Sequence, residues 1–182
     1  MGGSTVLSMA MGEKNEKRVR AASSFVTYAS ILVGLAFAAL LILFMDPILS
    51  IFGADAQTYD FARGYTFHIA WGAPFIIWSA AASFIVRAEG ASREAMIGSM
   101  IGTIANIILD PIFISVLGQG TAGAAIATSL GNIMASGYYL WYFLKKSRVL
   151  SISFKDFTCR NGILTRICST GLPTAIFSAL MS

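Results

Sequence analysis

Three long runs of this sequence are almost free of charge. Residues 21–45 and 111–144 contain no Asp, Glu, Lys, Arg or His, and residues 64–86 contain only His68 among these types. A helix needs about 20 apolar residues to cross the hydrocarbon core of a bilayer, so each run is long enough to do so. Strands are disfavoured, because the runs are too long for a barrel strand and do not alternate between polar and apolar residues.

The overall composition supports the same reading. Only 12% of the 182 residues are charged, against about 25% in an ordinary soluble domain. A fourth run, residues 95–117, is interrupted by Asp110 and Pro111. We therefore predict an all-α, polytopic membrane helix bundle with four spans, at about residues 21–45, 64–86, 95–117 and 121–144.

The distribution of Lys and Arg predicts how these spans are oriented. Residues 13–20 hold four basic residues, residues 46–63 hold one, and residues 145–170 hold six. Cytoplasmic loops retain an excess of positive charge, so the first and third of these segments are predicted to be cytoplasmic and the second external. The chain is thus expected to be a multi-pass protein of the cytoplasmic (inner) membrane. Its net charge of +4 lies mainly on the cytoplasmic face, and no nucleic-acid partner is predicted.

The two ends of the chain read as parts of further membrane segments. Residues 1–20 are predicted to be the end of a preceding helix and a cytoplasmic loop. Residues 147–170 mix apolar and basic residues and are predicted to be an amphipathic linker on the membrane surface, although a polar linker is an equal alternative for their first half. Residues 171–182 resemble the start of another transmembrane helix. The chain is therefore expected to be a fragment of a larger protein.

Asp110 is the most informative residue, because it is an ionisable group inside a predicted span. A carboxylate at the centre of a membrane helix costs about 2.5–3.5 kcal/mol on insertion scales, whereas each Ile, Leu, Val or Phe contributes only about 0.3–0.6 kcal/mol in return. The eleven such residues between positions 97 and 117 offset this cost with little to spare. A functional role for Asp110 is therefore favoured over a structural one.

The neighbours of Asp110 strengthen this interpretation. At 100° per residue, four polar side chains fall within an arc of about 60° on one helix face: Ser99, Thr103, Asn106 and Asp110. Because Asn106 and Asp110 are four positions apart, an amide and a carboxylate face the same point and can coordinate a hard cation or share a proton. Pro111 is expected to loosen the adjacent turn and free a carbonyl group. For Ser99 and Thr103, plain hydrogen bonding between helices is the favoured alternative.

For the other polar and small residues in the spans, a structural explanation is at least as favoured as a functional one. In the fourth span, Thr121, Thr128 and Asn132 lie on one face. Four small residues in the same span form a seam that allows close helix packing: Gly123, Ala127, Gly131 and Ala135. His68 is more readily explained as a hydrogen-bonded residue near the membrane interface than as a proton relay, and Pro74 as a kink.

Three stretches of the chain resemble the multidrug and toxin extrusion (MATE) family. The segment 106–113, NIILDPIF, followed by Gly118, Gly120 and residues 123–128, is similar to the signature of that family's fifth and sixth helices. Residues 2–4 with 11–15, and residues 86–90, resemble the loops after its second and fourth helices. Residues 171–173 resemble the entry to its seventh helix.

The resemblance implies that the chain covers helices three to six of twelve, in the amino-terminal lobe of a two-lobe transporter. It further implies a cation site in that lobe, formed by a carboxylate of the first helix together with Asn106, Asp110 and Thr128. The coupling ion is then Na⁺ or H⁺, with a possible Na⁺ site at these three residues and no other cofactor. The first-helix carboxylate lies outside this chain.

The leading functional hypothesis is a cation-coupled antiporter that exports organic cations and drugs. Its partners are small organic cations, membrane lipids and the remaining helices of the transporter. One alternative is a lipid-linked oligosaccharide flippase of the related superfamily, which is disfavoured because the spans contain no Lys or Arg to meet an anionic headgroup. Another is a membrane subunit with no transport role. An enzyme is not predicted, because no nucleophile–base pair, metal cluster or phosphate-binding loop is present in the sequence.

Overall fold

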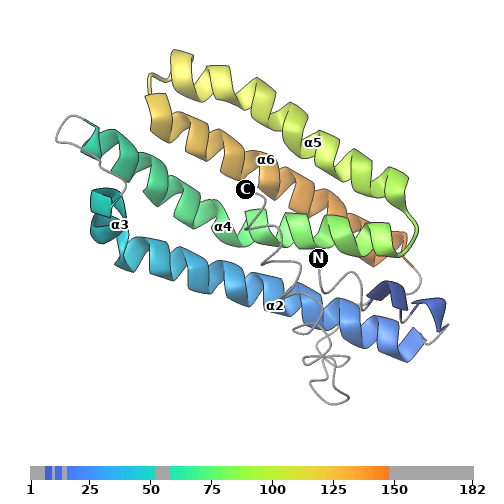
Figure 1. Ribbon diagram of the computed structural model, residues 1–182. Helices are drawn as coiled ribbons and strands as arrows, with labels where there is room; N and C mark the ends of the chain where they lie inside the picture. Colours follow the sequence, from blue (N-terminus) through green and yellow to red (C-terminus); the bar gives the residue numbers. More distant parts are fainter. Residues whose placement is uncertain (1–6, 10, 14–15, 52–57, 148–182) are drawn as a thin grey trace. The chain divides into compact units, whose positions relative to one another are not determined.

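The regular elements of this protein are helices. The computed structural model describes residues 7–9, 11–13, 16–51 and 58–147. In these ranges the main elements are α2 (Glu16–Leu43), α3 (Met45–Ile51), α4 (Tyr59–Ala88), α5 (Ser92–Pro111), the π-helix η1 (Ile112–Val116) and α6 (Gly120–Lys145) (Figure 1). The predicted all-α class is confirmed.

Three of the described helices are long and apolar enough to cross a membrane: Val19–Leu43, Tyr59–Ala88 and Ser92–Val116. They correspond to the first three predicted spans. The fourth predicted span is also helical, as the 26-residue α6, but it is not among the three. Its small residues and its Ser, Thr and Asn side chains lower its mean hydropathy, so its crossing of the membrane stays a prediction.

The helix bounds differ from those predicted. Helix α2 begins at Glu16, inside the segment predicted as a loop, and ends at Leu43, where a separate short helix follows. Helix α4 extends beyond the predicted residues 64–86 at both ends. The reason is that backbone hydrogen bonding continues into the polar residues at the membrane boundary, which a count of apolar residues leaves out. The predicted segment 171–182, and the predicted linker beyond Ser147, lie outside the described residues.

The chain divides into two compact units, and each of the four long helices has one part in the first unit and the other part in the second. The first unit combines Met1–Ala29, Ala80–Met96 and Tyr139–Ser182. In it the buried Tyr139 hydroxyl donates to the Ala95 carbonyl at 2.8 Å. The Glu89 carboxylate accepts hydrogen bonds from Tyr142 at 2.9 Å and Ser147 at 2.6 Å. These contacts fix the end of α6 against the α4–α5 turn.

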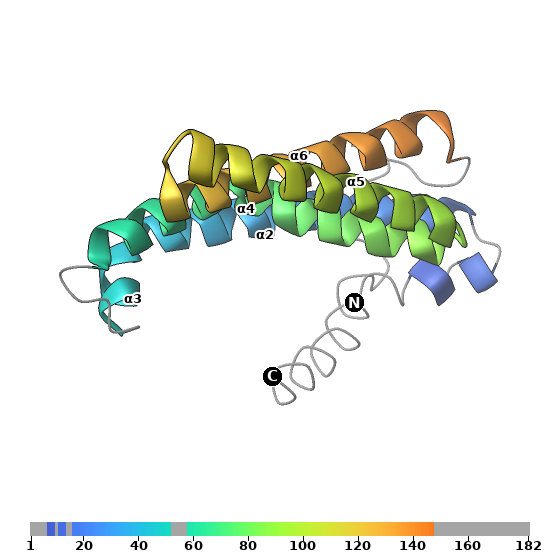
Figure 2. The ribbon, with the colours of Figure 1, turned by 90° about the horizontal axis from the view of Figure 1, so that it is seen from above.

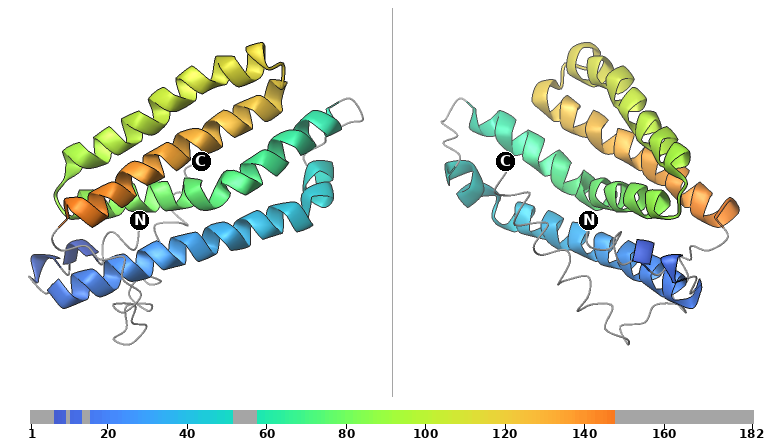
Figure 3. Two further views of the ribbon diagram at one scale, coloured as in Figure 1. Left: turned by 180° about the vertical axis from the view of Figure 1, so that it is seen from behind. Right: turned by 45° about the vertical axis from the view of Figure 1, so that its right-hand side comes forward.

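The second unit, Ser30–Ser79 and Ile97–Tyr138, contains all the predicted site residues. Within it, α6 packs on α4 through three hydroxyl groups that lie within hydrogen-bonding distance of α4 carbonyls: Thr121 and Phe61 at 3.3 Å, Ser129 and His68 at 3.4 Å, and Ser136 and Phe75 at 3.3 Å. The Ser129 hydroxyl also bonds the Ala125 carbonyl of its own helix, at 2.9 Å. The α4 acceptors are seven residues apart, and their residue numbers increase together with those of their α6 partners. In this unit, α4 and α6 therefore run in the same direction. Helix α4 contains Pro74, and Figure 3 shows α4 as one continuous helical ribbon.

Helix α5 runs against α6 in the opposite direction within this unit (Figure 2). The α-helical part of α5 ends at Pro111, which has no N–H to continue the ladder. The next five residues form a π-helix, closed by a hydrogen bond of 2.9 Å from the Leu117 N–H to the Ile112 carbonyl. Isolated π-helical turns are frequently found at functional sites. Here the π-helix directly follows Asp110.

Candidate cation-binding site

Asn106 and Asp110 of α5 meet Thr128 of α6, and all three side chains are half-buried. One orientation of the Asn106 amide gives both of its ends a complementary partner. In that orientation Nδ2 donates to Asp110 Oδ2 at 3.2 Å, and Oδ1 accepts from the Thr128 hydroxyl at 3.2 Å. In the opposite orientation Nδ2 donates to Thr128 Oγ1, also at 3.2 Å, and lies 3.5 Å from Asp110 Oδ1. Asn106 therefore connects Asp110 with Thr128 in either orientation.

The small-residue seam of α6 makes this meeting possible. Gly131 lies so close to α5 that a Cβ atom built on it falls 2.7 Å from the Gly102 carbonyl oxygen and 3.4 Å from Asn106 Cβ. A Cβ atom on Gly123 falls 2.7 Å from the backbone of Phe113 in the π-helix. The other two seam residues, Ala127 and Ala135, are buried as well. The predicted close packing is confirmed, and the seam faces α5.

The other two members of the predicted polar stripe do not join this group. Ser99 and Thr103 are exposed, and the Thr103 hydroxyl donates to the Ser99 carbonyl of its own helix at 3.0 Å. A hydroxyl four residues along a helix commonly bonds in this way. The alternative favoured for Thr103, hydrogen bonding between helices, is therefore wrong for this bond, which stays within α5.

His68 and Thr121 both have local roles in helix packing. The Nδ1 atom of His68 is 2.7 Å from the Gly64 carbonyl, which accepts a hydrogen bond when the ring carries its proton on Nδ1. Thr121 faces α4, where its hydroxyl donates to the Phe61 carbonyl. The predicted hydrogen-bonded role of His68 is confirmed, and the shared face of Thr121 and Thr128 does not bring Thr121 into the site.

No spacing pattern in the sequence connects α4 with the site. The buried Ser79 of α4 donates from Oγ to Asn132 Oδ1 at 2.8 Å, and Asn132 Nδ2 donates to the Thr128 carbonyl at 2.9 Å. Ser79 and Asn132 are 53 positions apart, so no local spacing indicates their contact. The polarity of Asn132 inside an apolar helix was the one available signal.

The donor atoms at this site suit a small hard cation. A carboxylate, an amide carbonyl and a hydroxyl are oxygen ligands of the kind that hard cations prefer. Among the residues that the structure describes, no three His, Cys, Asp or Glu side chains gather as metal ligands. A cation held by the described residues would therefore be balanced by one carboxylate and otherwise neutral oxygen atoms.

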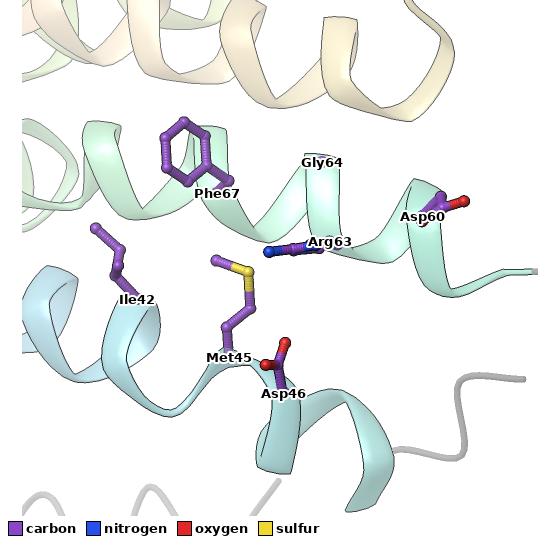
Figure 4. Close-up of a pocket in the computed structure, with 7 residues that line it drawn as sticks. All are labelled: Ile42, Met45, Asp46, Asp60, Arg63, Gly64 and Phe67. Carbon is purple, nitrogen blue, oxygen red and sulfur yellow. The ribbon is translucent and has the colours of Figure 1, made fainter. Parts of the chain in front are cut away.

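A pocket of about 460 Å³ lies elsewhere in the second unit, between residues of α2, α3 and α4 (Figure 4). Its lining combines two carboxylates, from Asp46 and Asp60, with the guanidinium of Arg63. The Asp46 carboxylate accepts a hydrogen bond of 2.6 Å from the Tyr59 hydroxyl. The pocket includes none of the predicted site residues, and its mixed charge does not select a cation.

Comparison with known proteins agrees with this architecture. Residues 1–112 match the family model described as MatE. The chain is 33% identical over 181 residues to the multidrug export protein MepA of Staphylococcus aureus (strain bovine RF122 / ET3-1), an alignment that covers 100% of this chain and 40% of MepA. The chain thus spans about 40% of the length of the curated relatives that it matches.

Two solved structures of multidrug resistance MATE family transporters of the MOP superfamily are also similar. The outward-facing conformation matches with a TM-score of 0.89 over 96% of this chain and 39% of that one, at 28% identity. The inward-facing conformation matches with a TM-score of 0.88 over 94% of this chain and 39% of that one, also at 28% identity. The matching segments therefore have closely similar folds in the two conformations.

Proposed function

This chain belongs to the MatE family, and we propose that it supplies the cation-coupling site of an exporter that exchanges organic cations for Na⁺ or H⁺. The family is one of transporters and not of enzymes, and the chain is a multi-pass protein of the cytoplasmic membrane. The remaining helices of the transporter complete the substrate path in this proposal. The observation that carries it is the contact of Asp110, through Asn106, with Thr128 on the neighbouring helix.

Asn106 is the direct partner of the charged carboxylate in this site, because its Nδ2 donates to Asp110 Oδ2 at 3.2 Å. A proton or a metal cation bound at Asp110 is expected to balance the carboxylate in its place, with the Asn106 amide and the Thr128 hydroxyl beside it.

Neutralisation of Asp110 supplies the energy that couples ion binding to conformation. An ionised Asp costs up to about 2.5–3.5 kcal/mol at the centre of a membrane helix and less toward the ends, and most of the cost disappears when a proton or a cation balances its charge. Asp110 lies toward the end of the span Ser92–Val116. A ligand shifts a conformational equilibrium only by its difference in affinity for the two states. A cost of this size is large enough to favour one lobe conformation when the ion is bound and another when it is absent.

The similarity to both transporter conformations supports this assignment. Because the matching segments differ little between the outward-facing and inward-facing structures, the segment is suited to carry an intact binding site through the transport cycle. We propose that this chain moves as part of one lobe and keeps Asn106, Asp110 and Thr128 together as it does so.

The test is efflux of a fluorescent cation, such as ethidium, from cells that express the complete transporter containing this segment. Asp110→Asn keeps the size of the side chain but removes its charge, and it is expected to abolish efflux while the protein remains in the membrane. Asp46→Asn, which changes an exposed carboxylate outside the site, is the matched control and should leave efflux intact. Undiminished efflux by the Asp110→Asn variant would remove Asp110 from the mechanism.

A further inference from the structure

Helix α4 contributes no oxygen ligand to the candidate site, yet two hydrogen bonds connect it to Thr128. Ser79 Oγ donates to Asn132 Oδ1 at 2.8 Å, and Asn132 Nδ2 donates to the Thr128 carbonyl at 2.9 Å. We call these two bonds the α4 link. All three residues belong to the same compact unit as Asn106 and Asp110.

The chemistry of Ser79 and Asn132 gives the α4 link a fixed direction. The Asn132 side-chain oxygen can only accept, and its nitrogen can only donate. The Ser79 hydroxyl has two acceptors within reach, the Ile76 carbonyl of its own helix at 3.0 Å and Asn132 Oδ1 at 2.8 Å. Because the hydroxyl lies on the oxygen side of the Asn132 amide, the nitrogen is directed toward Thr128. Ser79 is only 6% exposed, so water does not readily replace it as the donor.

We propose that Ser79 and Asn132 are positioning residues for the cation site, and that α4 sets the affinity of the site for the coupling ion through them. The inference rests on the proposed function of Asp110, Asn106 and Thr128. Thr128 is held on one side by Asn106 of α5 and on the other by the α4 link. Loss of the α4 link allows the helical turn at Thr128 to shift away from Asn106. This shift lowers the affinity of the site for the coupling ion.

The other polar contacts between α4 and α6 have a different form. The Ser136 hydroxyl donates to the Phe75 carbonyl at 3.3 Å, so this bond ends on the α4 backbone. Ser136 is 4% exposed, which is nearly the same as Ser79. Ser136→Ala therefore removes one buried hydroxyl from the same helix pair and leaves the α4 link in place.

The experiment measures how efflux by the complete transporter in membrane vesicles depends on the concentration of the driving cation. Ser79→Ala and Asn132→Leu should each raise the half-saturating concentration of Na⁺ or H⁺ by about two- to tenfold, the range that one neutral hydrogen bond supports. The maximum rate at saturating cation should stay within about twofold by the same reasoning. Ser136→Ala should change neither quantity.

A double variant separates positioning from general packing. Because both substitutions interrupt one link, Ser79→Ala added to Asn132→Leu should cause no further shift. Additive shifts, equal shifts from Ser136→Ala, or no shift in Ser79→Ala would each overturn the inference. If Asn132→Leu does not reach the membrane, the comparison of Ser79→Ala with Ser136→Ala decides the question. If these variants do not behave as expected but efflux still requires Asp110, only the inference about Ser79 and Asn132 is wrong and the proposed function stands. If efflux continues without Asp110, both the inference and the proposed function are wrong.

Discussion

Substitution of Gly131 tests whether the close approach of α5 and α6 holds the site together. In Gly131→Ala the new methyl group lies 2.7 Å from the Gly102 carbonyl oxygen, whereas ordinary contacts begin at 3.4 Å. The two helices must therefore separate locally by about 0.7 Å, because the obstacle is backbone and not a movable side chain. The same separation lengthens the 3.2 Å contact between Asn106 and Thr128 to about 3.9 Å, which is beyond hydrogen-bonding distance.

Two measurements follow from this geometry. Overpacking of this kind costs about 1–3 kcal/mol, which should appear as a lower unfolding temperature of the purified transporter. Loss of the Asn106–Thr128 contact should raise the half-saturating concentration of the coupling cation by about two- to tenfold.

Gly137 of the same helix provides the matched control. A Cβ atom built on Gly137 has no neighbour within 4 Å, so Gly137→Ala should lower neither the unfolding temperature nor the cation affinity. If Gly131→Ala and Gly137→Ala behave alike in both assays, the close approach does not maintain the site and the reasoning is refuted.

Two further predictions concern packing away from the cation site. A Cβ atom on Gly72 lies 2.1 Å from Ser129 Oγ, so Gly72→Ala should lower the unfolding temperature. Adding Ser129→Gly should restore it, because the second substitution removes the side chain that the new methyl group meets. If the unfolding temperature does not recover, Ser129 is not the obstacle. Glu89→Gln removes a charged acceptor from the Tyr142 and Ser147 hydroxyls and should destabilise the protein by about 1.5–3 kcal/mol, whereas Lys146→Ala, which breaks an ion pair whose lysine is 53% exposed, should cost about 1 kcal/mol or less. Equal losses in these two variants would contradict the role assigned to Glu89.

The spacing of charges predicted most of the helical architecture, because the exclusion of charge from hydrocarbon acts on each segment independently of its partners. It located α2, α4 and α5 and misjudged where they end. It also missed the break between α2 and α3, since Phe44 and Met45 are as apolar as the helix before them. Pro111 indicated a disturbed turn, but proline removes a donor without specifying which carbonyl the next N–H will reach, so the π-helix was not predictable.

In the candidate site, too, the contact between residues close in sequence was predictable and the contacts between distant residues were not. The four-residue spacing of Asn106 and Asp110 predicted their contact, because helix geometry alone fixes it. Thr128 entered only through the resemblance to a known family, and the structure brings it to Asn106 across 22 positions. The contact of Ser79 with Asn132 depends on how α4 packs against α6, and no pattern within either helix contains that information.

The central claim is that Asp110 itself binds the coupling ion, and infrared difference spectroscopy of the purified complete transporter tests it most directly. Adding Na⁺ or lowering the pH should change the carboxyl absorption, and one band of that difference spectrum should be lost in Asp110→Asn and kept in Asp46→Asn. A difference spectrum that is unchanged in the Asp110→Asn variant would show that the ion binds to other carboxylates only and would contradict the account.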